Sequence, residues 1–232
     1  MNADFGNGFG LAPLDRPGPL RSQVKDALIE LIISRQLAPG QHLVEADIAG
    51  QLQVSRQPVR EALQSLHADD WVDLRPGRGA FVHDPTVAEV DEVFAVRTLL
   101  EERSAALAAR NATPSDVDAL RAICARGRAT LADGDADALV LLNATLHRRV
   151  TEMSGNRVLA EFIASLDRRV RWYFTEIAMT RGAGSWDEHE ELCDAFAAND
   201  SKRAAQVMHT HTEHSQRAYH ERRQNGQEQL TR

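Results

Sequence analysis

Three histidines fall within six positions near the C-terminus, where residues 209–214 read HTHTEH. Clustered imidazoles are typical of metal sites, so the direction of each ring matters. On a helical projection centred on Ala204, His211 lies ~20° from the apolar stripe, His214 ~80° and His209 ~140°. The run is therefore not a local metal site, because only His211 points into the interior while His209 faces solvent.

Two other apolar stripes carry polar side chains in the same way. His189 follows the helical spacing of the stripe in SWDEHEELCDAF, and Asn143 and His147 lie one turn apart in ALVLLNATLHRRV. Burying such groups without partners costs roughly 1–3 kcal/mol each. A shared divalent ion such as Zn or Ni would satisfy several at once. We therefore expect Asn143, His147, His189 and His211 to meet at one ion.

Three alternatives remain open. A single histidine on an apolar stripe is more often a core residue, and the metal could be purely structural or absent. Three histidines beside an open coordination position are also the layout of a metal-dependent hydrolase. HEEL begins like the zincin motif H-E-x-x-H, but Cys193 occupies the position of the second histidine. Glu190 should turn away from the site, which makes the hydrolase the weaker reading.

The composition favours a helical protein. The 232 residues are poor in aromatics and rich in Ala and Leu, with a net charge of −7 and two cysteines. No run of about eighteen apolar residues occurs, so we expect no membrane segment. The first 20 residues lack the character of a secretory signal. The cysteine count argues against a disulfide framework and fits a reducing cytoplasm.

The sequence pattern changes near Pro85 from short, varied segments to long amphipathic ones. A Thr86-x-x-Glu89 capping box at this point predicts the start of a long helix. We expect a mostly α protein with an N-terminal winged helix-turn-helix and an antiparallel α-helical bundle. The predicted parts are a disordered arm at 1–19, a winged helix-turn-helix domain at 20–84, a helical domain at 85–222, and a disordered tail at 223–232. Within the bundle, six segments are predicted at 86–110, 114–132, 135–152, 156–179, 184–198 and 200–222.

The first domain reads as helix, helix, tight turn, helix and hairpin, which is the order of a winged helix-turn-helix. Its third helix begins at VSRQPVREAL, and its hairpin turns around Pro76-Gly77. The N-terminal end of the third helix would face bases in the major groove. The expected DNA-contacting residues are Ser55, Arg56, Gln57, Arg60, Arg75, Gly77 and Arg78. These arginines outweigh the acidic net charge, because placement decides contact with phosphates.

The segment PGQHLVEADIAGQLQVSRQPVREALQSL resembles the DNA-binding domain of GntR-type bacterial transcription regulators. The resemblance implies an operator-binding homodimer. Two positions depart from the family pattern. Gln57 replaces the usual Thr, and Asp70 replaces the usual Gly after the recognition helix, which predicts a slightly strained turn.

The second half resembles the C-terminal effector domain of FadR-type regulators, in its six-helix, VanR-like FCD version. VRTLLEERSAALAA, TLHRRV, SGN, EHEEL and MHTH occur in the family's order. The resemblance implies a metal held by an Asp, a His four residues later and two further histidines, which correspond to Asn143, His147, His189 and His211. It also implies a carboxylate effector in the metal-bearing cavity.

The resemblance gives Arg97 an effector-binding role, while its spacing to Glu101 equally allows a surface ion pair. Asn143 stands where Asp is typical, so we expect weaker metal binding and a stronger demand for an anionic ligand. Further pocket or interface candidates are Arg148, Arg168, Arg171, Trp172 and Tyr173.

Overall fold

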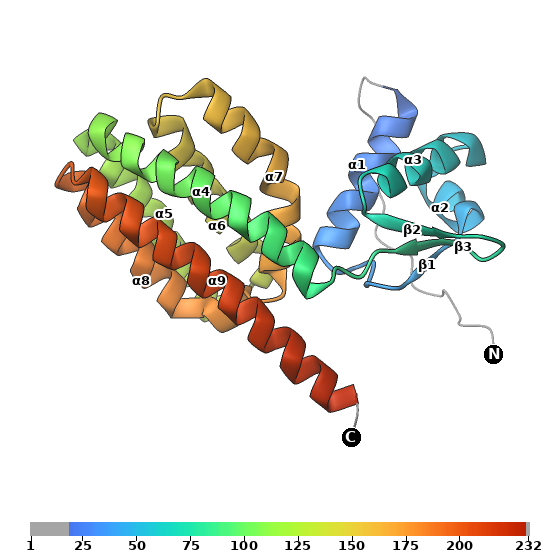
Figure 1. Cartoon of the computed structure of the whole chain (residues 1–232). Helices are drawn as coiled ribbons and strands as arrows, with labels where there is room; N and C mark the ends of the chain where they lie inside the picture. Colours follow the sequence, from blue (N-terminus) through green and yellow to red (C-terminus); the bar gives the residue numbers. More distant parts are fainter. Residues whose placement is uncertain (1–18, 231–232) are drawn as a thin grey trace. The chain divides into compact units, whose positions relative to one another are not determined.

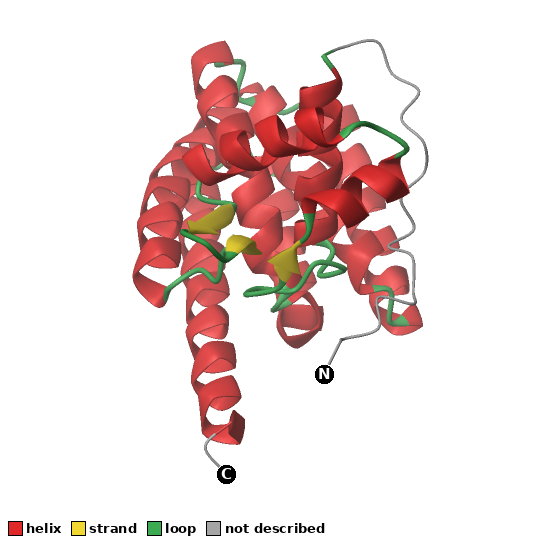
Figure 2. Cartoon of the chain, turned by 90° about the vertical axis from the view of Figure 1, so that its right-hand side faces the viewer, coloured by secondary structure: helices red, strands yellow, loops and turns green. Residues whose placement is uncertain are grey.

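The computed structural model describes residues 19–230, with side chains as far as residue 226. The chain divides into two compact units between Pro85 and Thr86, one residue beyond the predicted boundary. The predicted disordered arm at 1–19 lies outside the described residues except for Pro19. Figure 1 follows the chain through both units, and Figure 2 emphasises how much of it is helical.

The first unit is a winged helix-turn-helix, as predicted. Its elements are α1 (Leu20–Ile33), β1 (His42–Leu43), α2 (Glu45–Leu52), α3 (Arg56–Ala68), β2 (Val72–Arg75) and β3 (Gly79–Val82). The strands form an antiparallel sheet in the order β1-β3-β2, in which Val72 pairs with Val82 and Arg75 with Gly79. The short strand β1 is an addition to the predicted hairpin.

Apolar spacing explains how these helices pack. Val24 and Leu28 of α1 and Val59 and Leu66 of α3 are fully buried, so the two stripes predicted from the sequence form one core. After α3 the chain turns through Asp70, whose φ is 55°. A left-handed conformation favours Gly over residues with a side chain, which agrees with the strain predicted for Asp70.

The second unit is a helical bundle. Its helices are α4 (Val87–Asn111), α5 (Pro114–Asp133), α6 (Ala136–Met153), α7 (Arg157–Thr175), α8 (Ala178–Ala197) and α9 (Ser201–Leu230). α4 packs along α9 and also contacts α6, α7 and α8 (Figure 1). A residue on α4 can therefore meet side chains from most of the other helices.

Local chemistry fixes where α4 begins. The Thr86 hydroxyl accepts the Glu89 amide at 3.2 Å, and the Glu89 carboxylate accepts the Thr86 amide at 2.7 Å. This is the predicted capping box, which satisfies amides that a helix start leaves unpaired. The α4 register, and with it the position of Arg97, is set at the boundary between the two units.

Two predicted boundaries in the bundle are wrong. The break expected at residues 182–184 instead falls at Glu176–Ile177, and Gly182 forms a kink inside α8 with φ 40°. The predicted disordered tail at 223–232 is also wrong as far as Leu230, because α9 continues through it. Residues 223–230 contain few apolar side chains, but Glu, Arg and Gln have good helix propensity and can extend a helix that has no apolar stripe.

The bundle core contains the two cysteines. Cys124 of α5 and Cys193 of α8 are both buried and unbridged. A hydrogen bond with Cys124 and burial raise the pKa of the Cys193 thiol above its usual value. The Cys193 thiol is therefore a protonated core group.

Candidate functional site

The N-terminal end of α3 exposes polar side chains. Ser55, Arg56 and Gln57 are exposed, and Ser55 is the N-cap residue although its hydroxyl accepts no capping bond. Arg60 is also exposed but its guanidinium binds Glu45 through two bonds, with Nε–Oε1 at 3.0 Å and Nη2–Oε2 at 2.8 Å. Arg60 must leave Glu45 before Nε and Nη2 can bind a base or a phosphate.

The β2–β3 turn presents the second set of predicted DNA-contacting residues. Arg75, Gly77 and Arg78 are exposed, and the Arg78 amide donates to the Arg75 carbonyl at 2.9 Å. Gly77 has φ 70° and follows Pro76, the residue order of a type II turn. The Arg75 guanidinium lies 4.2 Å from the centre of the Phe81 ring, which supports it at the surface.

Three histidines from three helices meet inside the bundle. His147 of α6, His189 of α8 and His211 of α9 are buried, and each offers a ring nitrogen within 4.8 Å of the others. The ring centres lie 5.0 Å apart for His147 and His211, and 4.6 Å apart for His189 and His211. The helical projections thus predicted correctly which histidines turn inward.

Several polar atoms in this cluster have no hydrogen-bond partner. They include both nitrogens of His189, Nε2 of His211 and the Oδ1 oxygen of Asn143, all of them buried. Burial lowers the pKa of His189 well below its usual value and that of His211 to about 4, so both rings are neutral at pH 7. Neutral imidazoles with free lone pairs and an amide oxygen are a suitable donor set for a divalent ion.

Arg97 and Glu101 form a buried ion pair beside His147. Arg97 Nε lies 3.1 Å from Glu101 Oε1, and Glu101 Oε2 lies 3.0 Å from His147 Nδ1. Burial raises the pKa of Glu101, but the charges of Arg97 and His147 prevail and hold it well below its usual value. The i, i+4 pair expected for Arg97 does form, but it is in the interior rather than on the surface.

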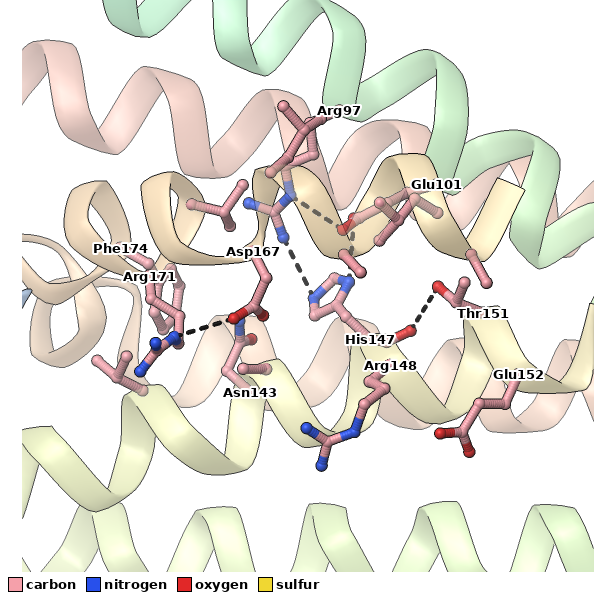
Figure 3. A pocket seen from close by; sticks show the side chains of 17 residues that line it. Arg97, Glu101, Asn143, His147, Arg148, Thr151, Glu152, Asp167, Arg171 and Phe174 are labelled. Atoms are coloured by element: carbon pink, nitrogen blue, oxygen red, sulfur yellow. Dashed lines mark hydrogen bonds and ion pairs between the residues drawn. The ribbon is translucent and has the colours of Figure 1, made fainter. Parts of the chain in front are cut away.

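A cavity of about 380 Å³ opens next to this pair (Figure 3). Its lining comes from α4, α6 and α7 and includes Arg97, Asn143 and His147. The remaining polar lining residues are Glu101, Arg148, Thr151, Glu152, Asp167 and Arg171. Apolar side chains of α6 and α7 complete the lining, so the cavity combines apolar walls with charged residues from all three helices.

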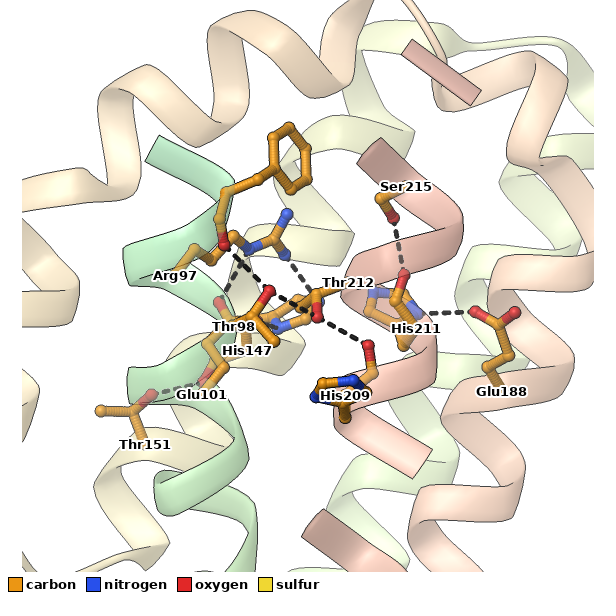
Figure 4. A network of polar contacts seen from close by, with 11 residues as sticks. Arg97, Thr98, Glu101, His147, Thr151, Glu188, His209, His211, Thr212 and Ser215 are labelled. Carbon is orange, nitrogen blue, oxygen red and sulfur yellow. Dashed lines mark hydrogen bonds and ion pairs between the residues drawn. The ribbon is translucent and has the colours of Figure 1, made fainter. Parts of the chain in front are cut away.

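Sequence reasoning missed two carboxylates at the cluster. Glu101 contacts His147, and Glu188 accepts a 2.8 Å hydrogen bond from His211 Nδ1 (Figure 4). Glu188 was detectable only as the neighbour of His189, since its direction depends on packing between α8 and α9. Of the further candidates, Arg148 and Arg171 line the cavity, whereas Trp172 and Tyr173 are core residues that are absent from its lining.

Glu190 does not face the histidines, as predicted. Its carboxylate lies 3.2 Å from the Arg121 guanidinium on the exposed side of α8. His209 also lies outside the cluster, where it pairs with Glu102 and Glu213. The residue after His189 is thus not placed as the general base of a zincin would be.

Comparison with protein families decides the identity of both units. Residues 92–214, just over half of the chain, match the FCD domain. Residues 20–82 match the bacterial regulatory proteins of the gntR family. The chain belongs to the GntR family. It is a transcription regulator that combines a GntR helix-turn-helix domain with an FCD domain.

Relatives agree with this assignment. An uncharacterized HTH-type transcriptional regulator in an unstable DNA locus of Streptomyces ambofaciens is 30% identical over 79% of this chain and 78% of its own length. YdhC of Bacillus subtilis, also an uncharacterized HTH-type regulator, is 24% identical over 87% of this chain and 91% of its own. The solved structure of Escherichia coli McbR/YncC has the same fold, with a TM-score of 0.73 at 22% identity, covering 88% of this chain and 98% of that one.

Among residues 19–230, no helix has both the length and the apolar character needed to cross a membrane.

Proposed function

We propose that this regulator binds operator DNA as a homodimer and senses a small carboxylate in a metal-containing pocket. The observation that carries the sensing part is the set of buried, unpaired donor atoms on Asn143, His189 and His211. Leaving such atoms unsatisfied is costly, and one ion would satisfy several together. The cavity beside them supplies the space for a ligand.

The DNA-binding part rests on exposed residues of the first unit. Arg56 at the start of α3 and Arg78 at the hairpin turn are both exposed. A guanidinium can bind a guanine edge or a phosphate through two parallel hydrogen bonds. One recognition helix reads one half-site, so a two-fold operator requires two copies of the chain. The site of action would be the cytoplasm, where bacterial DNA lies.

The proposed metal ligands are Asn143, His147, His189 and His211. The imidazole nitrogens of the three histidines suit Zn, Ni or a similar ion, whereas Mg and Ca prefer oxygen ligands. Such an ion would supply positive charge and open coordination positions for an anionic oxygen. The Asn143 amide adds no negative charge, so we expect weaker binding of the ion than at a site with Asp.

Charge balance makes the ion necessary for recognising an anion. The cavity lining carries three arginines and three carboxylates, which are Arg97, Arg148, Arg171, Glu101, Glu152 and Asp167. Arg97 is already paired with Glu101, and Arg171 with Asp167 at 3.1 Å. The lining alone is formally neutral, so a divalent ion would supply its net positive charge.

The walls favour a carboxylate with an apolar body. Three alanines, Ala144 of α6 and Ala160 and Ala164 of α7, leave room that larger side chains would fill. Val140 and Phe174 add apolar surface to the same cavity. Burial of an aliphatic or aromatic group against these walls would add affinity to the anchoring of the carboxylate.

Metal analysis tests the coordination proposal. Chelator-treated protein is reloaded with Zn²⁺ or Ni²⁺, and bound metal is measured in the wild type and in a His147→Ala/His211→Ala variant. A His209→Ala/His220→Ala variant is the matched control, because these two histidines pair with carboxylates outside the cluster. We expect about one ion per chain in the wild type and the control, and none in the cluster variant. Equal, negligible metal in all three would end the proposal.

Thermal-shift screening tests the effector. A library of small carboxylates of increasing apolar size is screened with and without reloaded metal, followed by operator-binding measurements with each hit. We expect stabilisation only in the loaded protein, and a change in operator affinity typical of allosteric coupling, about 5- to 150-fold. Equal stabilisation with and without metal would show that the effector binds by hydrogen bonds alone.

A further inference from the structure

One carboxylate accepts hydrogen bonds from three different side chains at the edge of the histidine cluster. Glu188 Oε2 accepts from His211 Nδ1 at 2.8 Å and also from the Arg181 guanidinium. Glu188 Oε1 accepts from His214 Nδ1 at 2.6 Å. Both carboxylate oxygens are therefore engaged, and Figure 4 shows Glu188 on the far side of His211 from His147.

This contact determines which nitrogen of His211 carries the proton. A carboxylate only accepts, so His211 Nδ1 must donate, and in a neutral ring Nε2 then bears the lone pair. Nε2 is buried and has no partner of its own. The His211 ring centre lies 5.0 Å from that of His147 and 4.6 Å from that of His189. The unused lone pair is thus available at the cluster.

We propose that Glu188 is a positioning residue that holds His211 in the Nδ1-protonated tautomer, with Nε2 free for a shared ligand. Arg181 and His214 in turn hold Glu188. The effect of Glu188 on metal binding rests on the proposed metal site, whereas the tautomer of His211 does not. A carboxylate on the outer nitrogen of a ligating histidine fixes the ring and makes its inner nitrogen more basic.

The proposal also accounts for His214, the marginal histidine of the HTHTEH run. Its side chain is 37% exposed, and it approaches Glu188 from the solvent side. His211 and His214 lie three residues apart on α9, so one carboxylate on α8 can reach both. Arg181 reaches the same carboxylate from the other side of the Gly182 kink in α8.

The tautomer can be measured directly in metal-free protein. Long-range ¹H–¹⁵N NMR of ¹⁵N-histidine-labelled protein above neutral pH distinguishes the two neutral tautomers, and a His211→Asn variant assigns the signal. We expect Nδ1–H for His211 in the wild type. Glu188→Gln should shift it toward Nε2–H, since a glutamine has only one acceptor oxygen for three donors. Glu190→Gln, two residues along and paired with Arg121, should leave it unchanged.

Metal affinity supplies the second measurement. Titration with Co²⁺, followed by its visible absorption, should give about 10- to 100-fold weaker binding for Glu188→Gln and a value within about twofold of wild type for Glu190→Gln. The melting temperature and operator affinity of the metal-free variants report whether each is folded. An unchanged Co²⁺ affinity in a folded Glu188→Gln variant would overturn the positioning role.

The outcomes separate this inference from the proposed function. If the wild type binds no metal, the proposed metal site fails, while the His211 tautomer still tests Glu188. If the wild type binds metal but His211 carries its proton on Nε2, the positioning role fails and the metal site stands. The wild-type spectrum decides this even where Glu188→Gln does not fold.

Discussion

The two units of this regulator use the same kinds of side chain in opposite ways. In the DNA-binding unit, Arg56 and Arg78 are exposed on a helix start and a hairpin turn. In the effector unit, Arg97 and Glu101 are buried and cancel each other next to the histidine cluster. Exposed charge serves a large, highly charged partner. The buried, balanced pair offers no net charge to a ligand, and the proposed ion would supply it.

The largest expected effect concerns the cost of burying the histidines. In chelator-treated protein, the unfolded chain binds a proton at His211 near pH 6.5, whereas the folded protein does so near pH 4. The unfolded state therefore holds more protons between these values, so stability falls as pH drops through this window. We expect a loss on the order of 3 kcal/mol from His211, with His189 adding to it in the same direction.

Urea unfolding of the metal-free protein at several pH values between 7 and 4 measures this loss. A His211→Asn variant is the control, and its stability should depend less steeply on pH. Glu188 adds a loss at lower pH: burial raises its pKa, but His211, His214 and Arg181 hold it at about 2. Parallel pH profiles for wild type and variant would mean that His211 is not held neutral by its surroundings.

The next effect concerns the exposed arginines. Arg56→Ala should weaken operator binding by about 1–3 kcal/mol at fixed salt, without changing metal content or effector binding. Arg60→Ala should weaken binding in the same way if Arg60 exchanges its ion pair with Glu45 for a contact with the DNA. Arg157→Ala is the matched control, because Arg157 is an exposed arginine of α7. Binding to an operator fragment selected from a random-sequence pool is the measurement. An affinity within about twofold of wild type for Arg56→Ala would refute the assignment of the recognition helix.

The two units also differ in how much of each site the sequence alone could predict. The α3 residues form one continuous motif, so their exposure could be predicted without tertiary structure. His147, His189 and His211 could be predicted as buried because each lies on an apolar stripe. Their carboxylate partners could not, since Glu101 and Glu188 reach them across helix contacts and through side-chain rotamers. The ion pair between Arg60 and Glu45 could not be predicted for the same reason, since it joins α3 to α2.

Asn143→Asp would add one buried negative charge to the effector unit, next to the histidine cluster. Without metal, the carboxylate has no partner of its own and should lower the melting temperature of the bundle, because an unpaired buried charge is costly. With metal, it should raise the affinity for Zn²⁺ by about tenfold, since an anionic oxygen binds a cation more strongly than an amide oxygen. Calorimetric titration and thermal melts with and without chelator measure both. Leu141→Asp, at an exposed position of the same helix, is the control. If the chelator-treated Asn143→Asp variant melted at a higher temperature than the chelator-treated wild type, the added charge would not be unpaired.

The smallest expected effect concerns the boundary between the units. Thr86 caps α4 at the first residue of the effector unit, and Thr113 caps α5 in the same way within that unit. Replacing either by Ala should lower the free energy of unfolding by about 1 kcal/mol, because the same kind of capping bond is lost. Only Thr86→Ala should also reduce the effector-induced change in operator affinity, since α4 carries Arg97 and Glu101 and follows directly from the DNA-binding unit. Denaturant unfolding and operator titration with and without effector measure the two quantities. Equal coupling in both variants would mean that the signal leaves the effector pocket by another route than the start of α4.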